Sequence, residues 1–313
     1  EIMDFYGEIW GGDLDGKVKE KLNQNFEPLI GETVKDKEKQ QKIKNACNYL
    51  IAQCGHEFLT KYNLSEVGSP ASINLTLNQV GSDPIEFPIN LTDLHMSYYF
   101  YQCIRTLQKV CDTNSPTVID IGGGYGGVMA KMKMAFPNSR CILLDLPELL
   151  PFQTYYLNKV FPEKKFFYFK DYLELGSTLF EDNFDFLIVP HWVIKDIPEV
   201  SVDQVINMRS MMEMSNSVIS SYFKEIQRIT KIGGLFACFN RYYKDHRNEK
   251  NIPGSSGELN LLKTYPYDDY WQILLSQTSI IQSHVHDLIV RRQSEKNLFP
   301  IMESMKSLPP SLL

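Results

Sequence analysis

The sequence predicts an α/β protein in which a mostly parallel, doubly wound sheet follows a helical N-terminal region. After residue 115, apolar runs of strand length alternate with amphipathic runs of helix length. A cluster of glycines joins the first of these strands to the first of these helices. Residues 279–293 alternate apolar and polar positions without an intervening helix, which indicates an antiparallel edge strand. We therefore expect a mainly helical cap over residues 1–114 and a sheet domain over residues 115–313.

Helical spacing governs much of the expected cap. Residues 35–62 place apolar side chains three or four positions apart, which predicts a helix, and residues 94–110 resume that spacing. Between them, residues 67–92 combine short alternating runs with Gly, Ser, Pro and Asn, which indicates a small β hairpin or a covering loop. The apolar face of the first helix consists of Ile43, Cys47, Leu50, Cys54 and Phe58.

The elements of the sheet domain follow in order. Apolar runs predict strands at residues 117–121, 141–145, 166–169, 184–189 and 235–240. Amphipathic stretches predict helices at residues 126–136, 148–160 and 217–230. The polar, glycine-containing stretch 242–271 is expected to be either a lid over the site or a solvated insertion.

Composition excludes several classes of protein. The 313 residues carry a net charge of −6 with scattered lysines, so no basic field exists to hold nucleic acid. The six cysteines lack the CxxC pairs of a zinc site, and no membrane span is expected, so we predict a cytoplasmic protein. Because the chain starts at Glu1 rather than at a methionine, we expect it to be part of a longer natural chain. Assembly into a homo-oligomer is left open.

The glycine cluster lies in VIDIGGGYGG, residues 118–127, at the end of a buried strand. Glycines there permit a turn whose backbone amides approach a ligand closely. The next strand, CILLD, ends in Asp145, about twenty residues further on, where a carboxylate can accept hydrogen bonds from ribose hydroxyls. The two features together predict a nucleoside-type cofactor.

Asp120 decides between cofactors. The spacing Gly122-x-Gly124-x-x-Gly127 alone serves NAD equally well. A carboxylate directly before the turn would repel a pyrophosphate, whereas it would favour the sulfonium and ammonium groups of S-adenosylmethionine. Asp120 therefore favours the methyl donor.

These residues resemble those of the class I S-adenosylmethionine-dependent methyltransferases, whose first motif is an acid followed by a GxGxG turn. A narrower resemblance, to a bacterial family of sugar O-methyltransferases, rests on the segments 145–159 and 207–241. The resemblance implies a Rossmann-like, doubly wound sheet, for which we expect seven strands, and S-adenosylmethionine as cofactor. It implies an acceptor that is a sugar, a nucleotide sugar or a glycan precursor, as in polysaccharide biosynthesis.

The resemblance also implies roles for individual residues. Asp120, Gly122 and Gly124 are expected to surround the methionine part of the cofactor. Asp145 is expected to bind the ribose and Leu146 to lie against the adenine. The remaining residues expected at the cofactor site are Tyr125, Gly126, Asp171, Tyr172 and Pro190.

Methyl transfer to a hydroxyl requires a group that removes the hydroxyl proton as the new bond forms. His191 follows the strand at 184–189, at the sheet edge that faces a ligand crevice, and histidine is the commonest general base. Glu213 is the rival base, because it lies in a long connection before the helix at 217–230. The expected acceptor-binding residues are Asn207, Arg209, Asn240, Arg241 and Tyr99, with plain packing or a local ion pair as the alternative for each.

Other functions stay open at this stage. No metal is expected, although Asp268-Asp269 or His284-x-His286 could contribute ligands. One alternative is an O- or N-methyltransferase acting on another small molecule. Two others are an NAD(P)-binding oxidoreductase, against which Asp120 argues, and a cofactor-binding module without catalysis.

Overall fold

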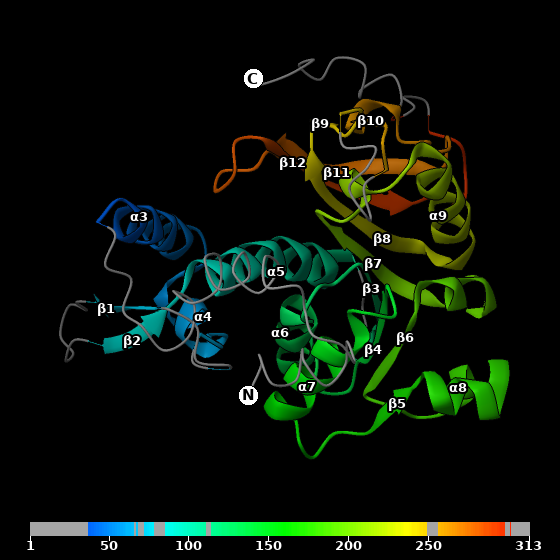
Figure 1. Cartoon of the computed structure of the whole chain (residues 1–313), viewed down its shortest axis with the longest axis horizontal. Coiled ribbons are helices and arrows are strands. Elements are labelled where there is room, and N and C mark those ends of the chain that lie inside the picture. Colours follow the sequence, from blue (N-terminus) through cyan, green and yellow to red (C-terminus); the bar gives the residue numbers. More distant parts are fainter. Residues whose placement is uncertain are drawn as a thin grey trace. The chain divides into compact units, whose positions relative to one another are not determined.

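The computed structural model describes residues 37–65, 67, 72–77, 85–110, 114–248, 256–297 and 301 (Figure 1). The chain divides into two compact units, residues 1–94 and 95–313. The boundary lies inside helix α5 (Leu91–Val110) rather than at residue 114, so most of α5 belongs to the second unit.

The described residues of the first unit form two helices and a hairpin. Its single predicted helix at residues 35–62 is instead two helices, because Gly55 adopts a φ of 80° between them. The expected hairpin is present, with Ile73 paired to Ile89 and Leu77 to Ile85. The elements are α3 (Lys37–Cys54), α4 (His56–Lys61), β1 (Ile73–Leu77) and β2 (Ile85–Ile89).

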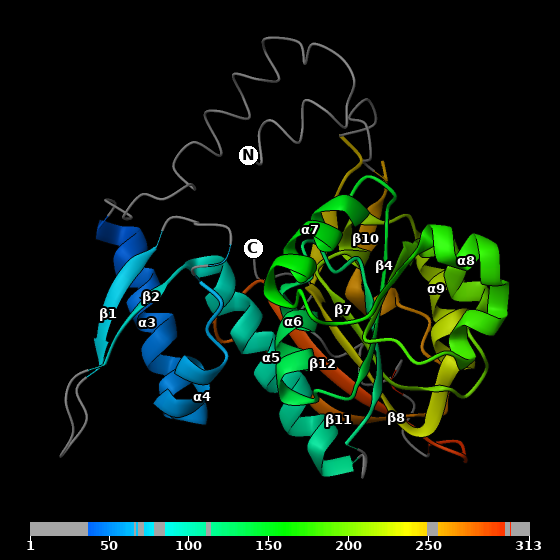
Figure 2. The same cartoon turned by 90° about the horizontal axis from the view of Figure 1, so that it is seen from below.

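The second unit is built on an eight-stranded sheet in the order β11-β12-β8-β7-β3-β4-β6-β5. The strands β5, β6, β4, β3, β7 and β8 are parallel, and β12 and β11 are antiparallel additions. Figure 2 shows helices α5, α6 and α7 on one face and α8 and α9 on the other, which is the doubly wound arrangement. The strands are β3 (Thr117–Ile121), β4 (Arg140–Asp145), β5 (Phe166–Tyr168), β6 (Phe186–Pro190), β7 (Val202–Met208), β8 (Thr230–Arg241), β11 (Trp271–Thr278) and β12 (Val285–Arg292). The helices are α6 (Gly127–Ala135), α7 (Leu150–Val160), α8 (Phe169–Leu175) and α9 (Asn216–Ile229).

The expectation of seven strands was wrong, and so was that of an edge strand at residues 279–293. The sheet has eight strands, and β12 lies inside it, between β8 and the true edge strand β11. The segment of β7 was expected to be part of a long connection. Its inner positions include Asp203, Gln204 and Asn207, all buried, and this polar content conceals the strand pattern.

Short elements complete the second unit. The segment 242–271 contains a two-stranded ladder of β9 (Tyr243–Asp245) and β10 (Leu259–Leu261). Short 3₁₀ helices also occur among the described residues of this unit. They are η2 (Gly176–Glu181), η3 (His191–Asp196), η4 (Met211–Glu213) and η5 (Leu262–Thr264).

The core of the second unit lies on the faces of the central strands. Every residue of β3 and β6 is buried, as expected for parallel strands covered by helices on both faces. Helix α9 presents a buried apolar face to the sheet through Ile219, Phe223 and Ile226. None of the helices in the described ranges has the length and apolar character needed to cross a membrane.

Candidate cofactor and acceptor site

The glycine turn joins β3 to α6; it is closely packed at Gly122 and open at Gly124. Gly122 and Gly124 have φ values of 70° and 60°, which L side chains rarely adopt. A Cβ on Gly122 would overlap the Ser210 side chain, whereas a Cβ on Gly124 would meet no atom within 4 Å. The turn is thus fixed at Gly122, where the backbone N–H also donates to the Leu144 carbonyl at 2.8 Å, and it is open at Gly124.

Asp145 ends β4 beside this turn. Its carboxylate accepts hydrogen bonds from the Gly124 N–H at 3.2 Å, the Leu146 N–H at 2.8 Å and the Gln153 side chain at 2.8 Å. Burial raises the pKa of Asp145 to about 6, and these hydrogen bonds oppose the rise. Leu146, directly after it, leaves 54% of its surface exposed, so an apolar patch adjoins a carboxylate that is already tied to the glycine turn.

Asp120 lies beneath the turn. Its side chain is 1% exposed, and Oδ1 has no hydrogen-bond partner among the described residues. Burial raises the pKa of Asp120 to about 8, and the nearby Asp145 adds to the rise. A Cβ on Gly123 would lie 2.5 Å from Asp120 Oδ2, which explains why the turn needs a third glycine.

A buried amide network links the turn to β7 and β8. The Asn207 Nδ2 donates to the Ile121 carbonyl at 2.9 Å and to Ser210 Oγ at 2.5 Å, and Ser210 Oγ donates to the same carbonyl at 2.9 Å. Asn240 Nδ2 donates to Asn207 Oδ1 at 2.8 Å. Both asparagines are fully buried, so these two expected acceptor-binding residues hold the strand ends together.

Arg209 and Arg241 lie at the ends of neighbouring strands. Arg209 follows β7 with a φ of 61°, and its N–H donates to the Phe239 carbonyl at 2.8 Å. Arg241 is the last residue of β8. Tyr99, from α5, is buried, and its ring contacts Phe239 at a centroid distance of 4.8 Å. The structure therefore brings Tyr99, Arg209 and Arg241 to the carboxyl ends of β7 and β8.

His191 lies on the other side of the glycine turn from these arginines. Pro190, the residue before it, pairs with Asp145 in the ladder between β4 and β6. His191 lines a pocket of about 390 Å³ together with Trp192 and residues of α9, including Tyr222. Burial raises the pKa of Tyr222, and Asp145 contributes to the rise.

Glu213 ends the 3₁₀ turn that follows β7. Its carboxylate is paired with the ammonium group of Lys244, from β9. His246 Nε2 lies 3.4 Å from the same carboxylate and 3.1 Å from the Met212 carbonyl. Glu213 is therefore held between two basic side chains beyond the carboxyl end of β7.

Asp171 and Tyr172 do not join the group around Asp145. They lie in α8, after the edge strand β5, and β6 separates β5 from β4. Asp171 accepts the Tyr168 N–H at 2.7 Å as a helix cap, and the Tyr172 hydroxyl donates to Asp196 at 2.6 Å. Tyr125, in the turn, packs its ring against Tyr156 of α7.

Sequence reasoning missed four residues that the geometry brings into the site: Gln153, Ser210, Tyr222 and Lys244. Gln153 could have been found as the polar residue on the inner face of the helix after Asp145. The other three carry no local signal, since only the packing of β7, α9 and β9 brings them there.

The residues considered as metal ligands are engaged elsewhere. Asp268 pairs with Arg292 at 2.5 Å, and the His286 ring lies within hydrogen-bonding distance of the Tyr242 and Ser276 hydroxyls. Within the described ranges, no group of three or more His, Cys, Asp or Glu side chains is arranged to hold a metal ion.

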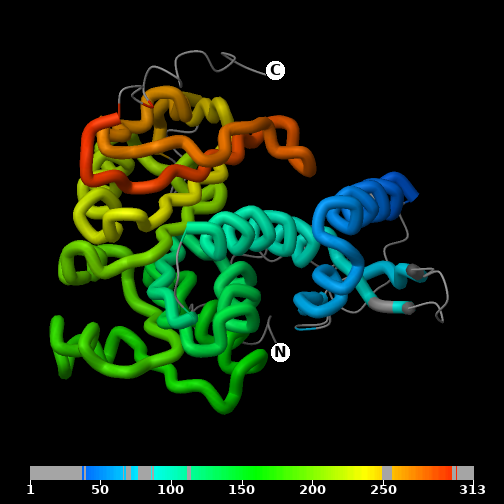
Figure 3. The backbone as a smooth tube through the Cα atoms, turned by 180° about the vertical axis from the view of Figure 1, so that it is seen from behind, coloured from blue at the N-terminus to red at the C-terminus, as the bar shows by residue number. Residues whose placement is uncertain are grey.

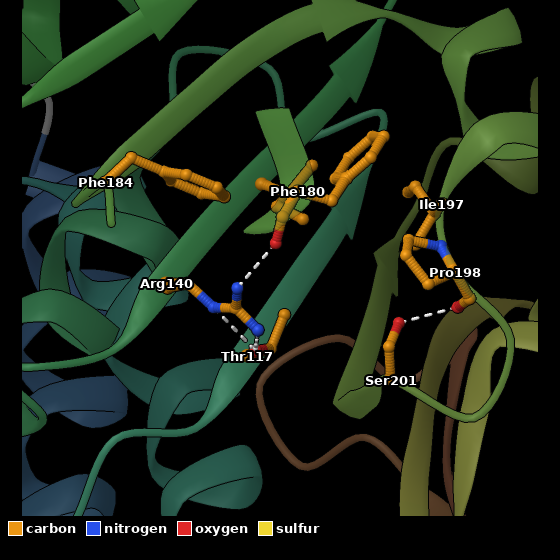
Figure 4. Close-up of a pocket in the computed structure, with 8 residues that line it drawn as sticks. Thr117, Arg140, Phe180, Phe184, Ile197, Pro198 and Ser201 are labelled. Atoms are coloured by element: carbon orange, nitrogen blue, oxygen red, sulfur yellow. Dashed lines mark hydrogen bonds between the residues drawn. The ribbon is translucent and has the colours of Figure 1, made fainter. Parts of the chain in front are cut away.

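A second cavity lies at the opposite edge of the sheet and is unsuited to a cofactor. It has a volume of about 20 Å³, which holds roughly one water molecule, and Thr117 and Arg140 line it at the amino ends of β3 and β4 (Figure 4). The Arg140 guanidinium is bonded to the Thr117 hydroxyl and to the Phe180 carbonyl. We therefore assign the site to the carboxyl ends of the strands, where open α/β sheets bind their ligands.

Comparison with known proteins identifies the cofactor half of this site. Residues 101–170 match the O-methyltransferase domain family, and this segment includes the glycine turn and Asp145. It is less than a quarter of the chain. The match confirms S-adenosylmethionine as the cofactor predicted from the sequence. It does not bear on a sugar acceptor.

Individual relatives are distant. Norreticuline-7-O-methyltransferase of Papaver somniferum is 29% identical over 79 residues, which are 25% of this chain and 20% of that protein. Among solved structures, a methyltransferase in complex with the Trm112 activator of Haloferax volcanii is 16% identical, with a TM-score of 0.45, and the likeness covers 66% of this chain and 95% of that one. Human N-acetylserotonin methyltransferase, solved with its S-adenosylmethionine, is 14% identical, with a TM-score of 0.37 and coverages of 65% and 54%. The chain thus spans about a fifth of the curated relative that it matches.

Proposed function

We propose that the chain is an S-adenosylmethionine-dependent O-methyltransferase that methylates a hydroxyl of a sugar or glycan precursor. The observation that carries the methyltransferase function is the glycine turn with Asp145 bonded to it, in the segment that matches the O-methyltransferase domain family. The sugar acceptor rests on the sequence resemblance of residues 145–159 and 207–241.

The residues around the turn fit the proposed cofactor. Gly124 has open space above it, Leu146 offers an exposed apolar surface for a base, and Asp145 can accept hydrogen bonds from ribose hydroxyls. The buried Asp120, directly before the turn, has a carboxyl oxygen without a hydrogen-bond partner among the described residues. When bound, the cofactor supplies a methyl carbon that a sulfonium activates for in-line displacement.

Glu213 is the stronger candidate for the general base. It follows β7, the neighbour of β3, and carboxyl groups are among the side chains that serve as general bases. In the proposed reaction a Glu213 oxygen would accept the proton of the acceptor hydroxyl. The cofactor would give its methyl group to that hydroxyl oxygen, lose its methyl–sulfur bond and leave as S-adenosylhomocysteine. His191 lies beyond β4 from the turn, so we assign it to the adenosine side of the cofactor together with Pro190.

A second candidate acceptor is a non-sugar small molecule. It is favoured by the match to norreticuline-7-O-methyltransferase, whose name gives it a different acceptor class. Both candidates share the cofactor site, so they differ only in what lies at the ends of β7 and β8.

The test combines binding and turnover. Calorimetric titration with S-adenosylhomocysteine, with NADH and NADPH in parallel, should give binding of the first ligand only. A methyl-transfer assay with labelled S-adenosylmethionine then compares hexoses, nucleotide hexoses and phenolic acceptors. Glu213→Gln should lower turnover at least 100-fold with unchanged affinity for S-adenosylhomocysteine, since general-base assistance contributes about 10²–10⁴-fold.

The outcomes separate the alternatives. Binding of a nicotinamide cofactor alone would refute the methyltransferase assignment. Transfer to phenolic acceptors alone would replace the sugar by the second candidate. Unchanged turnover in Glu213→Gln, together with reduced turnover in His191→Ala, would assign the role of general base to His191.

A further inference from the structure

A cluster of basic side chains lies at the carboxyl ends of β7 and β8, next to the glycine turn. Arg209 follows β7, and Arg241 ends β8, whose chain runs parallel to β7 with Met208 opposite Phe239. Because β7 is the neighbour of β3, both arginines lie at the edge where the glycine turn leaves the sheet. We refer to Arg209, Arg241, His95 and His284 as the basic cluster.

The backbone of Arg209 is fixed in an unfavourable conformation. Its φ of 61° lies in the left-handed region, which is unfavourable for a residue with a side chain. Two interactions hold it there: its own N–H bonds the Phe239 carbonyl, and the next residue, Ser210, is bonded over Gly122 to the Ile121 carbonyl. Such strain is maintained where the surrounding structure determines the direction of a side chain, which is common at ligand sites.

No acidic side chain in the described ranges forms an ion pair with either arginine. The Nε atoms of Arg209 and Arg241 are both buried and have no hydrogen-bond partner there. Arg228 and Arg292, by contrast, pair with carboxylates at 2.7 and 2.5 Å. Buried guanidinium donors without a partner carry a free-energy cost that an anionic ligand would relieve.

Two histidines from other elements complete the cluster. His284 precedes β12, and its carbonyl accepts the Tyr242 N–H, next to Arg241. His95, in α5, lies 3.4 Å from Gln282, which also accepts a hydrogen bond from the Tyr99 hydroxyl at 2.9 Å. Figure 3 shows the loop between β11 and β12, in orange, beside α5.

The cluster is electrostatically unbalanced. Burial, with smaller contributions from Arg209 and His284, lowers the pKa of His95 to about 4. The pKa of His284 is also lowered, first by burial and then by Arg241 and Arg209. Arg209 therefore acts on both histidines as a positive charge, and Arg241 acts on His284.

We infer that Arg209 and Arg241 bind an anionic group of the acceptor, so that the substrate is a carboxylate-bearing or phosphate-bearing sugar rather than a neutral or cationic molecule. The inference rests on the proposed methyltransferase function, which puts the acceptor at the ends of β7 and β8. A guanidinium fork matches both carboxylate and phosphate oxygens, so the geometry gives the charge of the ligand and the experiment gives its identity.

The first experiment measures anion binding directly. The whole chain is saturated with S-adenosylhomocysteine and titrated calorimetrically with inorganic phosphate and with succinate. We expect the wild type to bind at least one of them, and Arg209→Gln and Arg241→Gln each to weaken that binding at least tenfold. Arg247→Gln is the matched control, because the Arg247 guanidinium is exposed and paired with Asp245, and it should match the wild type.

The second experiment measures transfer to a hexuronate, a hexose phosphate and the neutral hexose. Preference for one anionic sugar, with kcat/KM at least tenfold lower in Arg241→Gln, would support the inference and identify carboxylate or phosphate. Equal transfer to the neutral hexose would overturn it, as would anion binding that neither variant weakens.

Two further outcomes keep the proposals separate. Loss of S-adenosylhomocysteine binding in the arginine variants would overturn the inference, because the cluster would then serve the carboxylate of the cofactor. Absence of S-adenosylhomocysteine binding by the wild type would instead count against the proposed function. The anion titration without cofactor would still test the cluster in that case.

Discussion

The contact between Gly122 and Ser210 gives the sharpest prediction about the site. Gly122→Ala and Gly124→Ala both place a methyl group at a positive φ, which costs about 1–2 kcal/mol in each case. Only the first also drives the methyl group into Ser210. That side chain must then move away from the Ile121 carbonyl and from Asn207, losing hydrogen bonds of about 1 kcal/mol each. We expect Gly122→Ala to lower the free energy of unfolding by about 2 kcal/mol more than Gly124→Ala.

The assay is urea-induced unfolding followed by circular dichroism and by tryptophan fluorescence. Any stabilisation from replacing a glycine in the unfolded chain applies to both variants, so it cancels in the comparison. Ser210→Gly provides the second test, since it removes both side-chain atoms that the new methyl group would meet. The double variant Gly122→Ala/Ser210→Gly should be about 2 kcal/mol more stable than the sum of the single effects predicts.

Two results would refute this reasoning. Equal destabilisation by Gly122→Ala and Gly124→Ala would mean that Ser210, after β7, does not pack closely against Gly122. Additive effects in the double variant would mean that Ser210 is not the residue in contact. Either result would also remove the link between the cofactor turn and Arg209.

Three further predictions concern buried carboxyl groups. Asp120 has a pKa raised to about 8, so the stability that it provides in its protonated form is lost as the pH rises toward and through that value. Asp120→Asn should therefore make the fall in unfolding free energy between pH 5 and pH 7 shallower, by up to about 1.4 kcal/mol per pH unit. An unchanged slope in urea unfolding would contradict the assignment. Asp145→Asn should weaken S-adenosylhomocysteine binding about 10- to 100-fold in calorimetry, since it replaces charge-assisted hydrogen bonds, and an unchanged affinity would remove Asp145 from the site. Tyr98→Phe removes the 2.5 Å hydrogen bond to the fully buried Asp287 and should cost about 1–3 kcal/mol in thermal or urea unfolding, a loss that Asp287→Asn in the same chain should partly restore.

The cofactor half of the site could be predicted because its signals are local in sequence. The glycines at 122 and 124 and the acid at the end of the next strand follow from turn geometry and from the period of the apolar runs. The predicted helices 126–136, 148–160 and 217–230 agree with α6, α7 and α9 to within two residues at each end. The mixed α/β class with a large, mostly parallel sheet is confirmed.

The acceptor half could not be predicted in the same way. Its geometry depends on β7, whose buried Gln204 and Asn207 break the apolar pattern on which strand prediction relies. The sheet order puts β6 beyond β4 from β3, so His191 follows a strand that is not the neighbour of β3. Neither this order nor the pairing of β7 with β3 has a local sequence signal. The roles of the individual site residues stay predictions.

The alternation of side chains along β8 has a consequence for how this protein could change its substrate. Asn240 is fully buried in the amide network, whereas the adjacent Arg241 is partly exposed. Neighbouring strand positions point to opposite faces, so the residue that maintains the scaffold and the residue proposed to bind the acceptor are separate. A library that varies position 241 while keeping position 240 should therefore alter selectivity at little cost in folding, which makes this strand end a suitable starting point for directed evolution.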